Sequence, residues 1–357
     1  MTEKQKCIVI PTFAQDVHAY VVAEALERIG MRHWLWHSSE INSEQNVTIE
    51  FGTPEQLLVS QQGETFSLSL DDVLCLWNRR IREINAPSHL EEEDSKLALA
   101  NAVKYRDNIL SLLNAAGRAV NDVHLAKRAE NKALQLHYAR RAGLLIPETA
   151  MSNDRGYVSD LIAHNKNGTI AKSFAAGSWA EDGTLLLNFS ALVKQGDLPA
   201  EPIMRADPMI FQGYVDKQYE VRITWFGTHP VAVKLVHQSL RETQVDWRAD
   251  AADIKPEIID IPEDIRLKCL SLMKEMGLAF SCMDFIVTNS KEWVFLEMNQ
   301  MGQFLWIEKA DPTINMLDLF LQLLIIGEVR SAQKPYFNIA LEEVLNQALE
   351  KVRLDVT

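Results

Sequence analysis

Three oxygen-bearing side chains late in the sequence have the types and the spacing of a metal site. Asp284 lies in the apolar run CMDFIVT, and Glu297 and Asn299 lie in WVFLEMN, with polar turn-forming residues between the two runs. A turn centred between Ser290 and Lys291 would place Asp284 directly opposite Glu297, with Asn299 on the same face. Facing carboxylates repel each other, and Mg²⁺, which prefers oxygen ligands, would relieve that repulsion.

The same hairpin also has a simpler interpretation. Antiparallel sheets commonly carry polar residues on a face that water covers. The residues that alternate with the polar ones would form the apolar face of such a hairpin: Met283, Phe285, Val287, Val294, Leu296 and Met298. On the hairpin alone, a metal site and a solvated polar face both remain open.

Four basic residues elsewhere are suited to bind anions. Lys172 lies in the strand-like run TIAKSF, where a half-buried lysine usually has an anionic partner. A phosphate ligand and an ordinary lysine at a strand edge both remain open for it. Lys132 lies on a predicted helix, and by itself it is also explained as a surface lysine. Arg222, in YEVRITWFG, and Arg248, in DWRAD, suit a carboxylate or an acyl phosphate through bidentate contacts. Each arginine alone is equally explained as half of a surface ion pair.

The elements that would position these residues fall into two groups. The first part of the chain reads strand, helix, strand at KCIVIPTF, residues 16–30 and MRHWLWHS, which predicts a parallel α/β unit. Strands at ETFSLSL and DVLCLWNRR and a helix over residues 91–115 complete it. A helix over residues 121–143 follows, and then short strands separated by turns predict antiparallel sheet. Helices are predicted over residues 263–277, 313–326 and 338–352.

Composition and missing motifs narrow the class of protein. The chain has 357 residues and a net charge of −13, which does not favour a nucleic-acid partner. Its four cysteines are far apart, so the sequence predicts reduced thiols in a cytoplasmic protein. The start lacks a signal-peptide pattern, and MLDLFLQLLII is interrupted by polar residues, so we expect no membrane segment. G-x-G-x-x-G, Walker A, G-x-S-x-G and H-E-x-x-H motifs are all absent.

Five segments, taken in order, resemble the ATP-grasp superfamily, and most of all the microviridin-type peptide ligases, the graspetide synthetases. IVIPTFAQDVHAYVVAEAL looks like the opening of their pre-grasp domain, and residues 121–154 look like the helix and strand that enter the grasp. FQGYVDKQYEVRITWFG resembles their hinge, HQSLRETQVDWR their serine-glutamine and Asp-Trp-Arg signature, and FLEMNQMGQFLWIE their metal-binding strand. One departure is Gln300, where many members carry proline.

The resemblance implies a role for each matching residue. ATP would be held through its phosphates by Lys132 and Lys172, through adenine by the hinge residues Gln212, Gly213, Tyr214 and Val215, and through ribose near Glu220. The catalytic arginines that stabilise the transferred phosphoryl group would be Arg222 and Arg248. Two Mg²⁺ ions would be bound by Asp284, Glu297 and Asn299.

The fold class implied is an α/β N-terminal pre-grasp domain followed by an α+β ATP-grasp fold, in which two antiparallel sheets with helices clamp ATP. The pre-grasp domain would span residues 1–120 and the central subdomain residues 121–208. The C-terminal subdomain with the metal hairpin would span residues 209–330, and a last helix residues 331–357.

The activity implied is an ADP-forming ligation. The enzyme would form an acyl phosphate on an Asp or Glu side chain of a ribosomal precursor peptide and link it to Ser, Thr or Lys as an ester or amide. One alternative is a small-molecule carboxylate–amine ligase. Another is a non-catalytic nucleotide- or peptide-binding protein, which the intact metal and lysine residues argue against. The family also suggests a homodimer, which the sequence itself does not show.

Overall fold

The structure is a computed structural model and describes residues 6–61, 64–174, 178–181, 184–187, 190–237 and 254–354. Arg248 and most of the HQSLRETQVDWR segment therefore lie outside the described residues, as do residues 175–177. None of the described helices is long and apolar enough to cross a membrane.

The first part of the chain is built on a parallel sheet. Its strand order is β2-β1-β6-β7, formed by β1 (Cys7–Thr12), β2 (Arg32–His37), β6 (Val73–Trp77) and β7 (Arg118–Val120). Helix α1 (Val17–Ile29) ends at Gly30, whose φ of 76° gives the left-handed conformation that glycine adopts readily. The long helix α2 (Glu92–Ala116) connects β6 to β7. These elements confirm the predicted parallel α/β unit.

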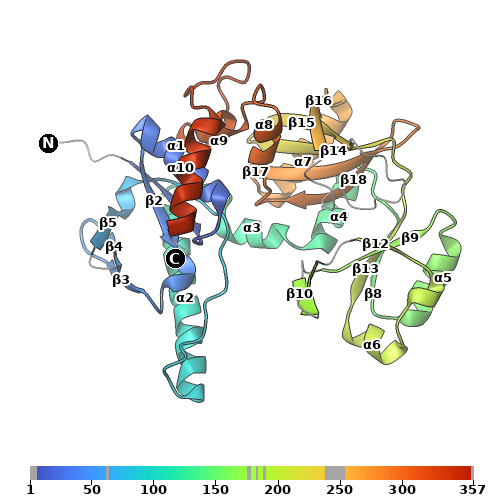
Figure 1. Cartoon of the computed structure of the whole chain (residues 1–357), viewed down its shortest axis with the longest axis horizontal. Coiled ribbons are helices and arrows are strands. Elements are labelled where there is room, and N and C mark those ends of the chain that lie inside the picture. The colour runs from blue at the N-terminus through green and yellow to red at the C-terminus, as the bar shows by residue number, and fades with distance from the viewer. Residues whose placement is uncertain are drawn as a thin grey trace.

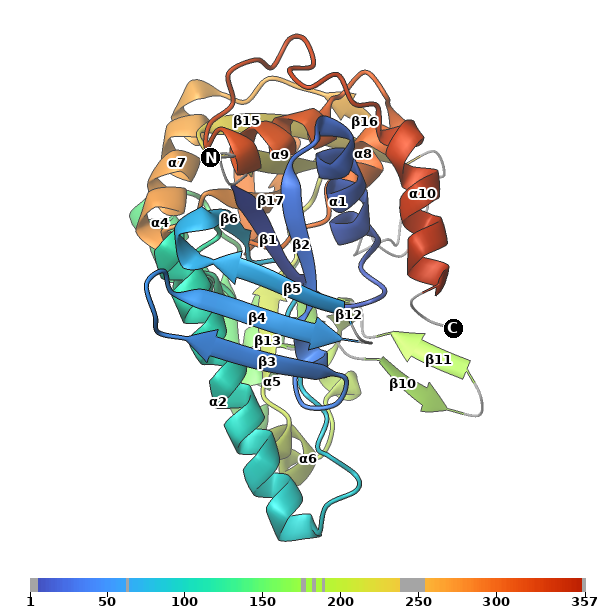
Figure 2. The ribbon, with the colours of Figure 1, turned by 90° about the vertical axis from the view of Figure 1, so that its left-hand side faces the viewer.

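A three-stranded antiparallel sheet extends from the parallel one, and only its last strand was expected from the sequence. It consists of β3 (Gln45–Glu50), β4 (Gln56–Gln61) and β5 (Glu64–Ser69). Leu57, Val59 and Leu68 on one face pack into the same core as Trp34 and Trp36 of β2. Figure 2 shows this sheet beside α2 and below the parallel strands.

Two helices lead into the rest of the chain, where the sequence predicted one. They are α3 (Val123–Ala129) and α4 (Lys132–Arg141). Each has its own N-cap: the Asp122 side chain accepts from the His124 and Leu125 N–H groups, and the Asn131 side chain accepts from the Leu134 N–H. The prediction of a single helix was wrong because Asn131 caps a second helix instead of continuing the first.

The next region is a four-stranded antiparallel sheet of order β12-β9-β13-β8. Its strands are β8 (Thr149–Ser152), β9 (Thr169–Lys172), β12 (Ala191–Val193) and β13 (Met209–Gly213). Helices α5 (Arg155–His164) and α6 (Glu201–Ala206) accompany it, with a hairpin of β10 (Ser178–Glu181) and β11 (Thr184–Leu187) beside it. Because β13 pairs with both β8 and β9, this sheet extends to Gly213.

A five-stranded antiparallel sheet carries the predicted metal hairpin. Its order is β16-β15-β14-β17-β18, with β14 (Tyr219–Phe226), β15 (His229–His237), β16 (Ile254–Ile258), β17 (Phe280–Val287) and β18 (Trp293–Asn299). Helix α7 (Glu263–Met276) packs on one face, and Leu272, Met276 and Phe285 meet in that core. Figure 1 shows this sheet and the four-stranded sheet as two separate layers, connected through α4 and β13–β14.

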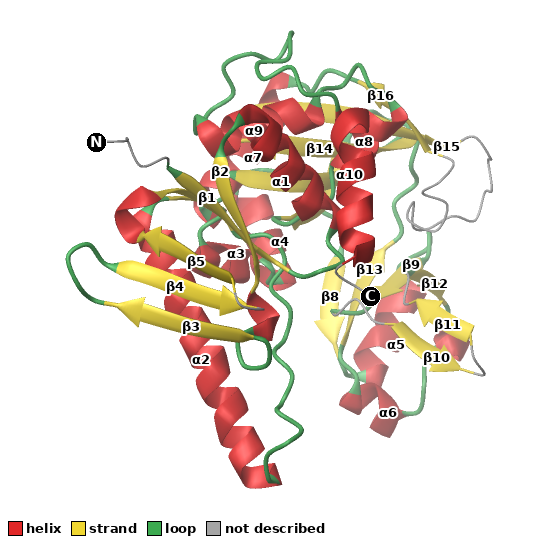
Figure 3. Ribbon diagram, turned by 60° about the vertical axis from the view of Figure 1, so that its left-hand side comes forward, coloured by secondary structure: helices red, strands yellow, loops and turns green. Residues whose placement is uncertain are grey.

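The last helices join the two ends of the chain. They are α8 (Leu305–Ala310), α9 (Met316–Ile325) and α10 (Leu341–Leu354). One continuous core contains Ile8 of β1, Phe280 of β17, Phe320 of α9 and Val344 of α10. Figure 3 shows these three helices gathered with α1 between the parallel sheet and the five-stranded sheet. The C-terminal helices therefore hold the first region against the metal hairpin.

Candidate active site

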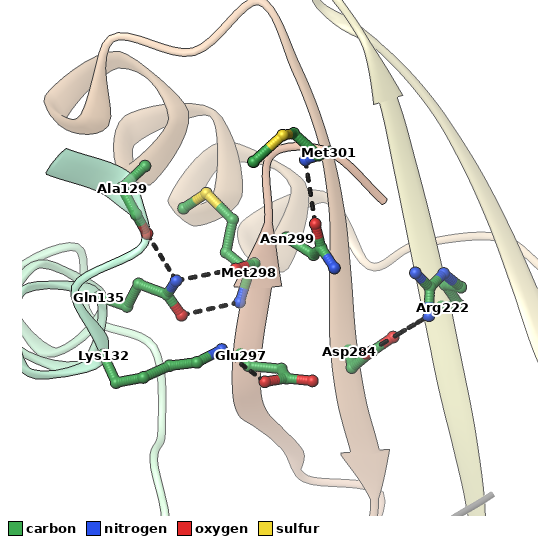
Figure 4. Close-up of polar contacts among 9 residues, drawn as sticks. All are labelled: Ala129, Lys132, Gln135, Arg222, Asp284, Glu297, Met298, Asn299 and Met301. Carbon is green, nitrogen blue, oxygen red and sulfur yellow. Dashed lines mark hydrogen bonds and ion pairs between the residues drawn. The ribbon is translucent and has the colours of Figure 1, made fainter. Parts of the chain in front are cut away.

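The β17–β18 hairpin brings the predicted metal ligands together. Asp284 pairs directly with Glu297, and Cys282 pairs with Asn299, so Asp284, Glu297 and Asn299 share one face of the sheet. This confirms the pairing expected from the sequence. Asp284 is buried, Glu297 is half-buried and Asn299 is exposed. The three side chains line a face that runs from the sheet interior to its rim, as Figure 4 shows.

A β-bulge changes the other face of the hairpin. Phe285 pairs with Phe295, whereas the adjacent Asp284 pairs with Glu297, so β18 has one extra residue, Leu296, at this point. The residues of β18 that enter the core are therefore Trp293, Phe295 and Met298. The expected set of Val294, Leu296 and Met298 was wrong for its first two members, because a bulge shifts the side-chain alternation by one residue.

Each of the two facing carboxylates is held by a cation. The Lys132 Nζ lies 2.6 Å from Glu297 Oε2, and both side chains are about 30% exposed. On the buried side, the Arg222 Nη1 lies 3.3 Å from Asp284 Oδ1, and Arg222 pairs with Asp284 across β14 and β17. Figure 4 shows the two cations approaching the carboxylates from opposite sides. The cations offset the repulsion that two facing carboxylates would otherwise cause.

Arg222 stays charged in its buried position. Burial acts to lower its pKa, but the nearby Asp284, Cys282 and Glu297 outweigh that effect, so the pKa of Arg222 is raised above its ordinary value. Burial raises the pKa of the neighbouring Cys282 thiol, which keeps the thiol neutral. The floor of the site is thus a fixed positive charge beside an uncharged sulfur atom.

Helix α4 is fixed against the hairpin by a residue that the sequence did not single out. The Gln135 Nε2 donates to Ala129 O at 2.7 Å and to Met298 O at 2.8 Å, and the Met298 N–H donates back to Gln135 Oε1 at 3.0 Å. Gln135 is buried and lies three residues after Lys132. A polar residue facing the core from a helix was the signal available. These bonds fix the position of Lys132 along β18.

The residues expected to bind the nucleotide lie on or next to the four-stranded sheet. Lys172 is the last residue of β9 and half-buried, so it sits at the end of the strand and not in its middle. Gln212 is buried in β13, and its Nε2 donates to Thr149 Oγ1 at 3.0 Å. Beyond it, the Gly213 N–H donates to Glu148 O at 2.8 Å.

The backbone that follows connects the two antiparallel sheets. The Tyr214 N–H donates to Gly168 O at 2.9 Å, and Val215 follows in the link to β14. Glu220 is buried in β14 and forms an ion pair with Lys217. The link is therefore anchored at its start by main-chain bonds and at its end by a strand of the metal-hairpin sheet.

The donor set of the hairpin fits Mg²⁺ that arrives with a ligand. Two carboxylates and an amide oxygen on one face are the groups that Mg²⁺ prefers, and Mg²⁺ usually keeps water and phosphate oxygens as further ligands. Among the described residues, no group of three or more His, Cys, Asp or Glu side chains is arranged to hold a metal. Mg²⁺ bound by Asp284, Glu297 and Asn299 would take its remaining ligands from water or phosphate oxygens.

Comparison with known proteins identifies the fold. No protein-family model matches the chain, and no curated protein matches it. The structure is similar to the RiPP-associated ATP-grasp ligase of Chryseobacterium gregarium, solved with ADP and a leader and core peptide. The TM-score is 0.80 and the identity 22%, over 90% of this chain and 97% of that chain.

Two other solved ligases agree over a similar span. The macrocyclase MdnC of Microcystis aeruginosa, bound to the precursor peptide MdnA, is 24% identical with a TM-score of 0.76, over 90% of this chain and 99% of that chain. The ATP-grasp ligase PsnB, solved with a minimal precursor, Mg and ADP, is 19% identical with a TM-score of 0.68, over 91% and 99%. The resemblance noted in the sequence is confirmed at the level of the fold, and this chain has the ATP-grasp fold.

Proposed function

We propose that this chain is an ADP-forming ATP-grasp ligase that activates a side-chain carboxylate of a precursor peptide. The activated Asp or Glu would be joined to a Ser, Thr or Lys side chain as an ester or amide, closing a macrocycle. The observation that carries the proposal is the pair of facing carboxylates, Asp284 and Glu297, each held by one cation on a fold shared with peptide ligases.

The charges of this cluster favour exchange with a metal–nucleotide complex. Asp284, Glu297, Arg222 and Lys132 sum to zero formal charge, and a triphosphate with its Mg²⁺ ions is also close to neutral. Glu297 would be a ligand of Mg²⁺ in the loaded site, and the Lys132 ammonium would then bind a phosphate oxygen instead. Such a swap costs little electrostatic energy because every charge keeps a partner. A solvated polar face would not need a lysine directed at one of its carboxylates.

The two antiparallel sheets would enclose the nucleotide. Lys172 at the end of β9 would bind phosphate, and the backbone of residues 212–215, with Glu220 beyond it, would bind adenine and ribose. Because the Gln212 side chain is engaged with Thr149, adenine would be read mainly by main-chain groups. Residues up to about 120 would form the pre-grasp domain, and β13 would belong to the central subdomain.

The residues of the chain would then work by position and charge. Bound Mg²⁺ supplies charge neutralisation at the phosphates. Arg222 lies beside the metal ligands and would stabilise the phosphoryl group as the substrate carboxylate oxygen attacks the γ-phosphorus and the bond to ADP breaks. A hydroxyl or amine then attacks the acyl carbon, loses its proton, and phosphate leaves. Arg248 stays a prediction for the same role, because it lies outside the described residues.

A peptide substrate is favoured over a small molecule by the compared structures. The three ligases compared above were each solved with a precursor or with leader and core peptides. A small-molecule carboxylate–amine ligase is the alternative that the experiment below separates. A cytoplasmic location and a homodimer stay predictions.

The proposal is tested with a small peptide encoded beside this gene and rich in Thr or Ser and in Asp or Glu. Incubation with Mg·ATP should remove one water mass from the peptide per link and yield ADP and phosphate in a one-to-one ratio with each bond. With a core peptide lacking Ser, Thr and Lys, hydroxylamine should trap the acyl phosphate as a hydroxamate. AMP and pyrophosphate as products would show attack on the α-phosphorus instead. ADP formation with amino acids but not with peptides would favour the small-molecule alternative.

A further inference from the structure

A buried ion pair in the first region reaches the loop that follows the metal strand. The Arg79 Nε lies 2.8 Å from Asp16 Oδ2, and the two side chains are 1% and 3% exposed. The same guanidinium donates from Nη1 to Met301 O at 2.6 Å. β1 and β6 are neighbouring parallel strands, so the segments after their carboxyl ends lie side by side. Arg79 thus connects the parallel sheet to a loop more than 200 residues away.

Met301, whose carbonyl oxygen Arg79 binds, also contacts Asn299 through its N–H group. The Met301 N–H donates to Asn299 Oδ1 at 2.9 Å, and this bond fixes the direction of the amide oxygen (Figure 4). A carbonyl oxygen has two lone pairs, so the bond leaves one of them for a cation. Met301 therefore transmits the position of Arg79 to the Asn299 side chain.

Further along the same loop, Phe304 and Leu305 are also held by a residue from the first region of the chain. His18 Nε2 accepts from the Phe304 and Leu305 N–H groups, each at 3.3 Å. Burial and the neighbouring Arg79 lower the pKa of His18 to about 3, so the ring stays neutral and can accept. A Cβ at Gly302 would lie 2.4 Å from Cys282 Sγ and 3.3 Å from Arg222 Nη2, so only glycine lets the loop pack this closely.

We propose that Arg79 is a positioning residue for the metal site: through Met301 it fixes the orientation of the Asn299 side chain at the rim of the metal hairpin. The inference rests on the proposed function, because it assumes that Asn299 is a ligand. It adds that the metal site is completed by the first region of the chain and not by the five-stranded sheet alone. Residues that orient metal ligands typically change metal affinity by about 10–100-fold when they are removed.

The test is a titration of the full chain with Mn²⁺, followed by electron paramagnetic resonance, in the presence of saturating ADP. Arg79→Gln should weaken Mn²⁺ binding by at least about tenfold, while the affinity for ADP in EDTA stays within about twofold of the unaltered chain. Arg79→Lys keeps the charge beside Asp16 and provides a second variant that should fold. The matched control is Arg82→Gln, whose exposed guanidinium lies 3.8 Å from the Phe13 ring centroid.

A double-mutant cycle separates positioning from general damage. In an Asn299→Ala background, Arg79→Gln should change Mn²⁺ affinity by less than about threefold, because the group that it positions is gone. Additive effects, or an equal loss of metal-free ADP affinity, would overturn the proposal. If Mn²⁺ did not raise the affinity of the unaltered chain for ADP, the proposed function itself would fail. If it bound Mn²⁺·ADP and the Arg79 variants did too, only the positioning role would fail.

Discussion

At the scale of single residues, the site is a set of charges that are already paired before any substrate arrives. Lys132 stands at Glu297 and Arg222 at Asp284. The lysine contact is half-exposed, so the ammonium can be exchanged, whereas the arginine contact is buried and fixed. The two contacts therefore differ: Arg222 is a buried, fixed part of the site, and we propose that Lys132 is the group that would bind the nucleotide.

Removing one charge from the hairpin tests this assignment. Glu297→Gln keeps the shape of the side chain, and we expect ADP formation to fall by at least roughly a hundredfold, or about 3 kcal/mol of transition-state stabilisation. The melting temperature should change little, because the half-exposed ion pair with Lys132 contributes little stability and its loss is accompanied by less repulsion between the facing carboxylates. Chromatography of the nucleotides measures the rate, with the exposed Glu328→Gln as the matched control. Near-normal turnover at ordinary Mg²⁺ would mean that Glu297 belongs to a solvated face.

Glu308 gives the chain a pH-dependent stability. Burial raises the pKa of Glu308 to about 7 from its ordinary value of 4.5, with Asp318 adding to the effect, although the Leu317 and Leu341 N–H groups donate to it. A carboxyl that holds its proton more tightly in the folded state stabilises that state below the unfolded pKa and loses this effect as the pH rises through about 7.

The expected signature is a pH-dependent difference between two chains. The unfolding free energy of the unaltered chain minus that of Glu308→Gln should fall by up to about 3 kcal/mol between pH 4.5 and pH 8. Glutamine keeps an acceptor oxygen but cannot ionise, so it serves as the reference. Urea unfolding at both pH values gives the number. A difference that is constant, or that grows with pH, would contradict the assignment.

At the scale of elements, the hairpin and α4 form one unit through Gln135. Its side chain makes three bonds with main-chain groups of α3 and β18 and is 1% exposed. Gln135→Leu would keep similar bulk and leave the N–H and C=O groups of Met298 without that partner in a buried place. We expect the free energy of unfolding to fall by roughly 2–4 kcal/mol.

The same variant should also misplace Lys132. ATP binding should weaken more than the stability loss alone accounts for, which isothermal titration well below the unfolding transition can measure. The matched control is His137→Leu on the same helix, which leaves the Gln135 bonds intact. An unchanged ATP affinity in a destabilised Gln135→Leu chain would show that the bridge supports folding and not the site.

The features of the β17–β18 hairpin that depend on local periodicity were predicted from the sequence. The pairing of Asp284 with Glu297 follows from a period of two along each strand and a short polar turn. The bulge at Leu296 does not, because it depends on how Phe295 and Trp293 pack beneath α7. Contacts between distant segments, such as that of Arg79 with Met301, cannot be predicted from the residue periodicity of either segment.

Two further features were not predicted from the sequence: the strands β3 and β4, and the break between α3 and α4. β3 and β4 do alternate, with Leu57 and Val59 buried on one face, but each strand is only six residues long and rich in polar residues. The break between α3 and α4 was visible in Asn131, a good N-cap residue, but the same residue is tolerated inside helices. The Asn131 cap and the contacts of α4 with β18 together favour the second helix.

At the scale of the whole molecule, the first and last elements share one core. α1 packs against α10, and the Arg28 Nη1 lies 2.6 Å from Glu343 Oε2 at the edge of that contact. Val344 of α10 is fully buried in the cluster that includes β1 and α1. The parallel sheet is therefore stabilised by residues from the opposite end of the sequence.

A small cavity between α1 and α10 should destabilise elements that are distant from α10 in the sequence. Val344→Ala should lower the free energy of unfolding by about 1–3 kcal/mol. Hydrogen exchange should rise in α1 and β1 and stay unchanged in β8 and α5, which belong to a different core. Ile203→Ala on α6, an exposed aliphatic position at 60%, is the control. A uniform rise in exchange across all regions would contradict a local role for α10.

The contact of α1 with α10 also has a consequence during synthesis of the chain. About 310 residues separate the end of α1 from the start of α10. At roughly 5–20 residues per second, the ribosome needs about 15–60 s to make them. Throughout that time the face of α1 that α10 later covers stays open to water, although the strands beside it are already present. The nascent chain therefore presents an apolar helix face that holdase chaperones can bind until the last helix emerges.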